Sequence, residues 1–125
     1  MKIAVVGSRT FEGGWNYEAM ASIMLAFGAT EIISGGAPGA DRLAERYAVE
    51  KLLPLTVLQA DWDALGKSAG FERNKLIVQA CDGVVAFWDG QSRGTKHTMS
   101  LCWKAGKPLA IIRTDMLIKE ADCDG

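Results

Sequence analysis

Short runs of apolar residues alternate along the chain with segments that repeat apolar residues every three or four positions. The runs contain β-branched residues and have the length of strands that are buried on both faces of a sheet. They lie at 3–6, 31–34, 55–58, 84–88 and 109–112. The segments between them predict amphipathic helices at about 16–28, 41–52, 71–81 and 95–105, the first of them capped by Asn16.

This alternation predicts an α/β fold with a mainly parallel five-stranded sheet whose strands are joined by right-handed crossovers. We expect residues 1–113 to form one domain. Residues 114–125 are expected to be a C-terminal tail or a short helix.

Composition fits an ordinary globular protein, because the 125 residues are 49% hydrophobic and 23% charged. The apolar runs are too short to span a membrane and the chain enters a strand pattern at once, so we expect a cytoplasmic protein without a signal peptide. Three cysteines without a CxxC pair suit reduced thiols, and a single histidine gives too few ligands for a zinc site. No metal or obligatory cofactor is therefore expected.

The charge balance argues against a protein that lives on duplex DNA. The formal net charge is −1 and the pI is about 5.8, whereas such proteins usually carry a basic face. We therefore expect that nucleic acid is not a partner, although aromatic residues near cationic loops keep single-stranded nucleic acid as a third alternative.

Ligands of open parallel sheets bind beyond the carboxyl ends of the strands, and three segments at those ends combine glycines with polar groups. Gly7-Ser8-Arg9-Thr10 offers bare main chain, hydroxyls and a guanidinium for a phosphate, or else is a surface turn. It matches neither GxGxxG nor a Walker A loop.

The stretch SGGAPGAD, residues 34–41, places three glycines before a helix N-terminus that would favour an anion. Asp41 could cap that helix or accept ribose hydroxyls, and a tight turn with an Asp cap is the alternative. The stretch DGQSRGT, residues 89–95, is a second such loop. Arg73 lies in FERNK, residues 71–75, which brings cations to the same end or simply forms a solvated helix face.

The aromatic residues and the histidine allow two interpretations each. Trp62 and Trp88 fall at strand ends, where an indole could stack on a base or pack under the loops. Trp103 lies in an apolar helical stripe and is predicted to be core. His97 is interpreted as a surface or capping residue rather than a general base, since no catalytic triad pattern accompanies it.

Together, GSRTF, SGGAPGAD, AGFERNK and FWDGQSRGT resemble motifs of the SLOG superfamily of Rossmann-like nucleotide-binding domains, in its YspA and YpsA-related branch. This superfamily also contains Lonely Guy phosphoribohydrolases, DNA-processing Smf proteins and molybdenum-cofactor carriers. The resemblance covers residues 1–113. It implies a single three-layer domain with helices on both faces of the sheet, a pocket for a nucleotide or nucleotide-derived ligand, and often a homodimer or larger homo-oligomer.

Binding of such a ligand, in order to sense, carry or sequester it, is the first functional hypothesis. The alternative is hydrolysis or transfer at an N-glycosidic bond, as in the Lonely Guy enzymes, with Arg73 and Asp89 as candidate catalytic residues. Thr98 stands where those enzymes have a glutamate, so the usual carboxylate is missing. The candidate ligand-binding residues are Gly7, Ser8, Arg9, Ser34, Gly35, Gly36, Gly39, Asp41, Arg73, Asp89, Ser92, Arg93, Gly94 and Thr95.

Overall fold

Five parallel strands form one sheet in a computed structural model that describes residues 1–7, 14–35, 38–60, 63 and 66–115. The strand order is β3-β2-β1-β4-β5, and every neighbouring pair is parallel. The strands are β1 (Lys2–Gly7), β2 (Glu31–Ser34), β3 (Leu55–Val57), β4 (Gly83–Trp88) and β5 (Leu109–Arg113). The predicted α/β fold with a parallel five-stranded sheet is confirmed.

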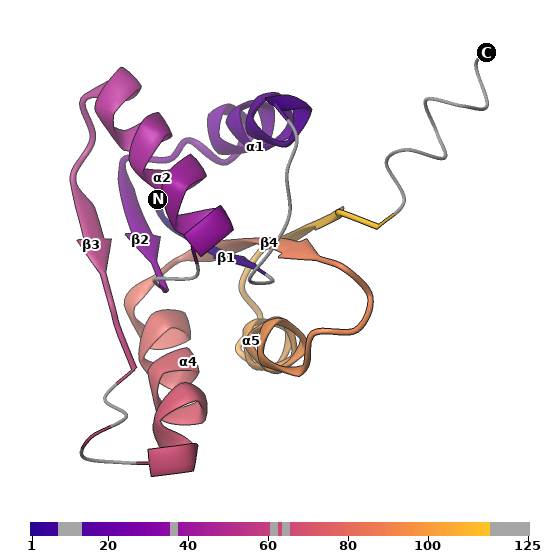
Figure 1. Cartoon of the computed structure of the whole chain (residues 1–125). Coiled ribbons are helices and arrows are strands. Elements are labelled where there is room, and N and C mark those ends of the chain that lie inside the picture. Colours follow the sequence, from indigo (N-terminus) through magenta and orange to yellow (C-terminus); the bar gives the residue numbers. More distant parts are fainter. Residues whose placement is uncertain (8–13, 36–37, 61–62, 64–65, 116–125) are drawn as a thin grey trace.

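Helices cover both faces of this sheet (Figure 1). Their bounds are α1 (Gly14–Phe27), α2 (Pro38–Lys51), α4 (Ala69–Ala80) and α5 (Arg93–Lys104), with a short 3₁₀ helix, η1 (Gly66–Ser68), before α4. In β1, Ile3 and Val5 belong to the core under α1 and α2, whereas Ala4 and Val6 belong to the core under α4 and α5. Because both faces are buried, the strands are continuous apolar runs.

None of the helices in these described residues is both long and apolar enough to cross a membrane. The part of the predicted C-terminal tail from residue 116 onward lies outside the described residues.

Each of the helices α1, α2, α4 and α5 begins two or three residues earlier than the sequence pattern predicted. In α2 the helix already starts at Pro38, whose fixed φ and missing N–H suit the first helical position. In α5 the side chain of Ser92 caps the helix by accepting the N–H of Thr95. Glycines that seemed to mark loops, Gly39 and Gly94, therefore lie in first helical turns, and Asn16 is a buried residue inside α1 rather than its cap.

The prediction that Trp103 belongs to the core is wrong, because its side chain is 79% exposed. The buried residues of α5 are Thr95, Thr98 and Cys102. Thr98 can be buried because its hydroxyl donates to the carbonyl oxygen of Gly94, at 3.2 Å. Two hydroxyl residues, Thr95 and Thr98, therefore take buried positions that the apolar pattern of this helix did not assign to the core.

A three-residue cluster joins α1 to α2. The Tyr17 hydroxyl donates to the carboxylate of Glu50, and Arg46 forms an ion pair with the same carboxylate, with Nε 3.1 Å from Oε1. The guanidinium carbon of Arg46 also lies 3.8 Å from the centre of the Tyr17 ring. Desolvation and the bond to Glu50 raise the pKa of Tyr17 to about 12. The outer side of α2 is therefore fastened to α1 by polar as well as apolar contacts.

Gly7→Ala is expected to destabilise the fold. A Cβ on Gly7 would lie 3.1 Å from the Cβ of Phe87 and 3.2 Å from the Cβ of Ala40, and neither atom can rotate away. We expect the free energy of unfolding to fall by about 1–3 kcal/mol, the usual result of overpacking. Urea denaturation with an unchanged m-value is the measurement.

Gly94→Ala is the matched control, because a Cβ at Gly94 meets nothing within 4 Å and the residue is helical. Its free energy of unfolding should stay the same or rise by up to about 1 kcal/mol. A Gly7→Ala variant as stable as the wild type would contradict this account of the packing.

Candidate functional site

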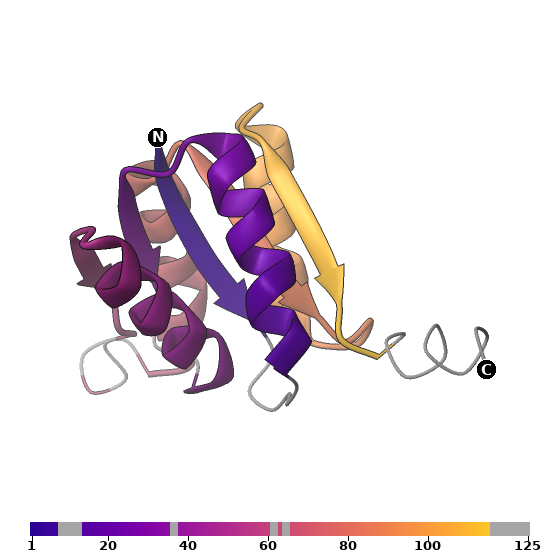
Figure 2. The same ribbon diagram turned by 90° about the horizontal axis from the view of Figure 1, so that it is seen from above.

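The carboxyl ends of the strands lie along one edge of the sheet (Figure 2). From β1 the chain proceeds outward to β2 and β3, and then crosses to β4 on the other side of β1. The strand order therefore reverses between β1 and β4, the position at which open α/β sheets bind ligands. Gly7 and Phe87 are paired at this point. The segments after β2 and β4 flank it.

Two residues near the start of α4 connect the segments after β2 and β4. Arg73 donates from Nη1 to the carbonyl oxygen of Gly35, and from Nε to Oδ1 of Asn74 at 3.1 Å. Asn74 donates from Nδ2 to the carbonyl oxygen of Gly94 at 3.3 Å, and Nδ2 also lies 3.1 Å from Nδ1 of His97. The structure thus brings Gly35, Arg73 and Gly94 into one hydrogen-bonded network.

The guanidinium of Arg73 is half-buried, and this burial lowers its pKa from the ordinary value. Its two bonds go to neutral oxygens, those of Gly35 and Asn74. Within the described part of the chain Arg73 forms no ion pair. A partly desolvated cation without a carboxylate partner favours the approach of an anion.

Asp89 shapes the loop that leads into α5. Its Oδ1 accepts the backbone N–H groups of Gln91 and Ser92, each at 2.8 Å. Ser92 in turn caps α5, and its carbonyl oxygen accepts Trp88 Nε1–H at 3.1 Å. Asp89 and Ser92, both candidate ligand residues, therefore also hold the loop in shape. Arg93 and Gly94 follow in the first turn of α5 and are exposed.

Asp41 has a partner within the protein. The Ser34 hydroxyl, fully buried at the end of β2, donates to Oδ1 of Asp41 at 2.6 Å. Asp41 lies in the first turn of α2, so this bond ties the helix start to the strand end. Gly39, in the same turn, is half-buried.

At two glycines of this edge, internal packing would crowd an added Cβ. A Cβ on Gly7 would meet Phe87 and Ala40, as described above, and a Cβ on Gly35 would lie 3.0 Å from Cδ1 of Ile77 and 3.4 Å from Nη1 of Arg73. From the sequence, a turn and the close approach of a ligand were both considered for the glycines at these positions. Gly94 differs, because its Cβ position is open.

Trp88 packs under the loop after β4. Besides its bond to Ser92, its ring lies 5.1 Å from the guanidinium carbon of Arg113. Of the two roles considered for this indole, the structure shows packing. Ser8, Arg9, Gly36 and Trp62 lie outside the described residues.

Sequence reasoning missed Asn74, the residue that links the network. It is 3% exposed and lies on the same stripe of α4 as Ile77 and Val78. A polar residue three and four positions before buried apolar residues was the available signal. His97, interpreted as a surface or capping residue, is half-buried, contacts Asn74 and packs edge-to-face on Phe71 with ring centres 4.7 Å apart.

These features define an α/β protein of Rossmann type with polar and glycine residues gathered at the carboxyl edge of its sheet. Residues 1–64, half of the chain, match the model of the YspA, cpYpsA-related SLOG family. The Gene 61 protein of Mycobacterium phage D29 is 40% identical over 84 residues, which cover 62% of this chain and 67% of that protein. The chain belongs to the YspA, cpYpsA-related SLOG family.

A solved structure shares the fold. DNA processing protein A from Helicobacter pylori, described for its single-stranded DNA binding mode, aligns with a TM-score of 0.68 and 21% identity over 99% of this chain and 73% of that one. The expectation that nucleic acid is not a partner was wrong, because a protein built on this fold is described as binding single-stranded DNA. Net charge and pI describe the whole chain and do not report a local cationic site such as Arg73.

His97 should make stability depend on pH. Burial, followed by the charges of Lys75 and Lys104, lowers its pKa. The unfolded chain then binds a proton near pH 6.5 while the folded protein does not, so stability is complete above about pH 6.5 and declines as the pH falls below it. Urea denaturation between about pH 5.5 and 7.5 measures this slope.

His97→Gln is the control, since glutamine keeps an acceptor for Asn74 but does not titrate, and His97 is the only histidine of the chain. The slope should disappear in this variant. An equal slope in both proteins would exclude His97 as its source.

Proposed function

We propose that the protein binds a nucleotide or a nucleotide-derived ligand at the carboxyl edge of the sheet, between the start of α4 and the start of α5. The supporting observation is Arg73, a half-buried guanidinium whose described bonds go to neutral oxygens. A guanidinium has five N–H donors, and these bonds use two. The others suit the oxygens of a phosphate, which arginine recognises through paired hydrogen bonds.

The first turn of α5 supplies the second half of the proposed site. The N–H of Thr95 is capped by Ser92, but the N–H groups of Arg93 and Gly94 have no acceptor within the helix, and the helix dipole favours a negative charge there. Gly94 lies in this turn with open space at its Cβ position. The carbonyl of Gly94 is held by Asn74, next to Arg73. A phosphate at this place would meet the arginine and the helix start together.

The remaining candidate residues are proposed to complete the site. Arg93 would add a cation, and the hydroxyls and carboxylates near the strand ends would contact the sugar. They are Gly7, Ser34, Gly35, Gly39, Asp41, Asp89, Ser92 and Thr95, with Ser8, Arg9 and Gly36 from outside the described residues. Sensing, carrying or sequestering a ligand requires only that the ligand is bound, without a chemical step.

Single-stranded DNA is tested beside mononucleotides, because the DNA processing protein that shares the fold is described as binding it. Each nucleotide unit of single-stranded DNA offers the same combination of phosphate, sugar and base as a mononucleotide. Affinity for DNA should fall steeply as salt rises, in proportion to the number of phosphates contacted. One phosphate site at Arg73 would instead give a shallow salt dependence and little gain with oligonucleotide length.

Ligand binding should raise thermal stability. A panel of nucleoside mono-, di- and triphosphates, NAD, ADP-ribose and a deoxyoligonucleotide is compared by thermal shift. A ligand present at 100 times its dissociation constant adds about 2.7 kcal/mol of stability. No shift with any member of the panel would contradict the proposal.

Variants then locate the site. Arg73→Gln should weaken binding of the best panel member at least about tenfold, because the charge is lost, and Gly94→Ala should weaken it while leaving the free energy of unfolding unchanged or higher. Lys104→Gln makes the same charge change at the far end of α5 and should bind like the wild type. If Arg73→Gln binds as tightly as the wild type, the site is elsewhere.

N-glycosidic cleavage of a nucleoside monophosphate remains the competing activity, with Arg73 on the phosphate and Asp89 as acid or base. Free base detected by chromatography after incubation with the panel would reveal it. Asp89→Asn is expected to abolish release of the base, and it keeps an oxygen to accept the N–H groups of Gln91 and Ser92. Unchanged turnover in Asp89→Asn would exclude Asp89 from the chemistry.

A further inference from the structure

Asn74 is a buried residue whose side-chain amide is fully engaged between α4 and the start of α5. Only 3% of the residue is exposed. Its Oδ1 accepts Nε–H of Arg73 at 3.1 Å. Its Nδ2 lies 3.3 Å from the carbonyl oxygen of Gly94 and 3.1 Å from Nδ1 of His97. An amide nitrogen carries two hydrogens, so these two neighbours use both.

The partners leave only one orientation for this amide. The Nε–H of an arginine can only donate and a backbone carbonyl can only accept, so Oδ1 faces Arg73 and Nδ2 faces Gly94. Nδ1 of His97 then meets an N–H group and has to accept it. A histidine ring that accepts through Nδ1 is neutral and carries its proton on Nε2. The amide of Asn74 therefore sets the position of the His97 proton.

The same network determines which nitrogens of Arg73 are left for a ligand. A guanidinium has one N–H on Nε and two on each of Nη1 and Nη2. Asn74 uses the donor on Nε, and the carbonyl oxygen of Gly35 uses one on Nη1. The donors that remain, as far as the described residues go, are all on the two terminal nitrogens. A phosphate would therefore meet the terminal end of the guanidinium rather than its Nε side.

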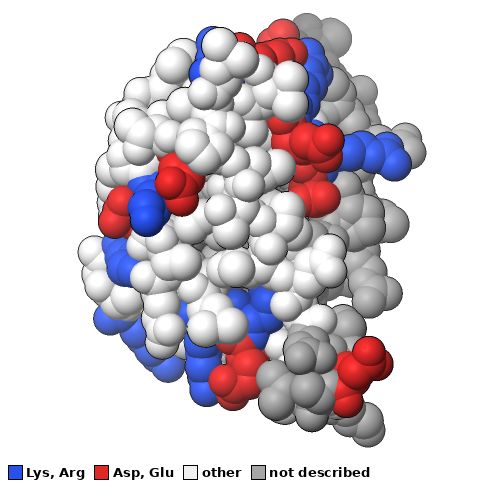
Figure 3. Space-filling model, turned by 90° about the vertical axis from the view of Figure 1, so that its left-hand side faces the viewer, with Lys and Arg blue, Asp and Glu red and all other residues white. Residues whose placement is uncertain are grey.

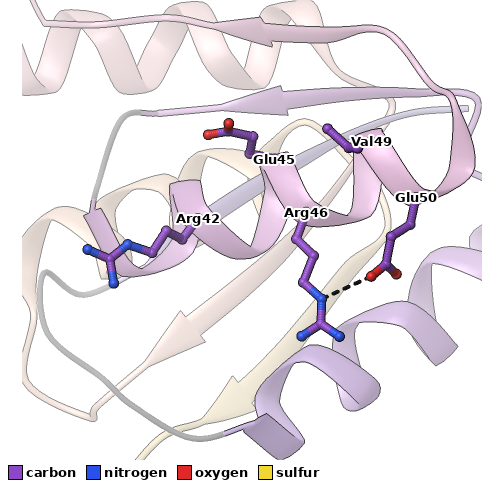
Figure 4. A pocket seen from close by; sticks show the side chains of 5 residues that line it. All are labelled: Arg42, Glu45, Arg46, Val49 and Glu50. Carbon is purple, nitrogen blue, oxygen red and sulfur yellow. Dashed lines mark hydrogen bonds and ion pairs between the residues drawn. The ribbon is translucent and has the colours of Figure 1, made fainter.

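Charged side chains elsewhere in the protein are held differently. On the face shown in Figure 3, positive and negative side chains lie next to one another in several places. Arg46 gives a direct comparison, because its Nε also lies 3.1 Å from a side-chain oxygen, but that oxygen belongs to the carboxylate of Glu50 (Figure 4). An amide resembles a carboxylate in shape and has no charge. It can therefore fix a guanidinium without cancelling its charge.

We propose that Asn74 is the positioning residue for anion binding by Arg73, an inference that rests on the function proposed above. Its amide holds the guanidinium and the carbonyl of Gly94 in one arrangement, so that the terminal nitrogens of Arg73 and the start of α5 are available to the same phosphate. Donors that are fixed beforehand lose less conformational entropy when a ligand binds. A carboxylate in place of the amide would compete with the ligand for Arg73.

NMR of the single histidine tests this arrangement without any ligand. The two ring nitrogens of His97 are observed in protein labelled with ¹⁵N above about pH 8, where an ordinary histidine is neutral. Nδ1 should be unprotonated in the wild type. In Asn74→Asp it should become protonated, because a carboxylate can only accept a hydrogen bond. A wild type that carries the proton on Nδ1 would overturn the proposal.

Pyrophosphate is the probe for binding, since it requires neither a base nor a sugar, and calorimetric titration gives its dissociation constant. Asn74→Ala should raise this constant at least about threefold, and Asn74→Asp at least about tenfold, because the carboxylate also cancels charge. In protein that already carries Arg73→Gln, adding Asn74→Ala should have a much smaller effect. An equal effect in both backgrounds would show a merely structural role and refute the proposal.

Gln79→Glu is the matched control, because it makes the same change from amide to carboxylate at an exposed position of α4. It should bind pyrophosphate like the wild type and leave the His97 proton on Nε2. Circular dichroism establishes which variants are folded, and Asn74→Ala suffices if Asn74→Asp is not. A wild type that does not bind pyrophosphate would contradict a phosphate site at Arg73, and this role of Asn74 with it. Equal binding by the wild type and Asn74→Ala would overturn the role of Asn74 alone.

Discussion

A parallel sheet that is buried on both faces is the constraint on which the rest of this structure depends. After each strand, the chain must return to the end of the sheet at which the parallel strands begin. It does so through a helix on one face of the sheet or the other. The carboxyl ends consequently gather at one edge, and so do the segments that follow them. Residues as distant in sequence as Gly35 and Arg73, 38 positions apart, can then meet.

Much of the polar chemistry at that edge is used to hold the edge together. Asp89 and Ser92 organise the entry to α5, and Ser34 ties β2 to Asp41. Side chains engaged in this way are pre-organised, and pre-organisation reduces the conformational entropy that a ligand must remove. The same residue can therefore support the loop and contact a ligand, and hydrogen bonding within the protein does not by itself separate the two roles.

Arg73 differs from the other arginines that the structure pairs. Arg46 and Arg113 each have a carboxylate partner on the surface, where an ion pair contributes little to stability. Arg73 is withdrawn from solvent and rests on carbonyl and amide oxygens. The neutral oxygens accept from two of its five donors and do not cancel its charge. This difference distinguishes a candidate anion site from a structural ion pair.

The sequence by itself determined the strands, their parallel arrangement and the segments at the carboxyl edge. Hydrophobic periodicity and turn residues are local properties, so they can be recognised without knowing which residues are in contact. It also indicated Arg73 within its motif. Only the tertiary structure decided that Phe87 would crowd a Cβ at Gly7, that Asn74 links two loops, and that Trp103 faces solvent. These facts depend on which atoms lie next to each other across distant elements, and no local pattern encodes that.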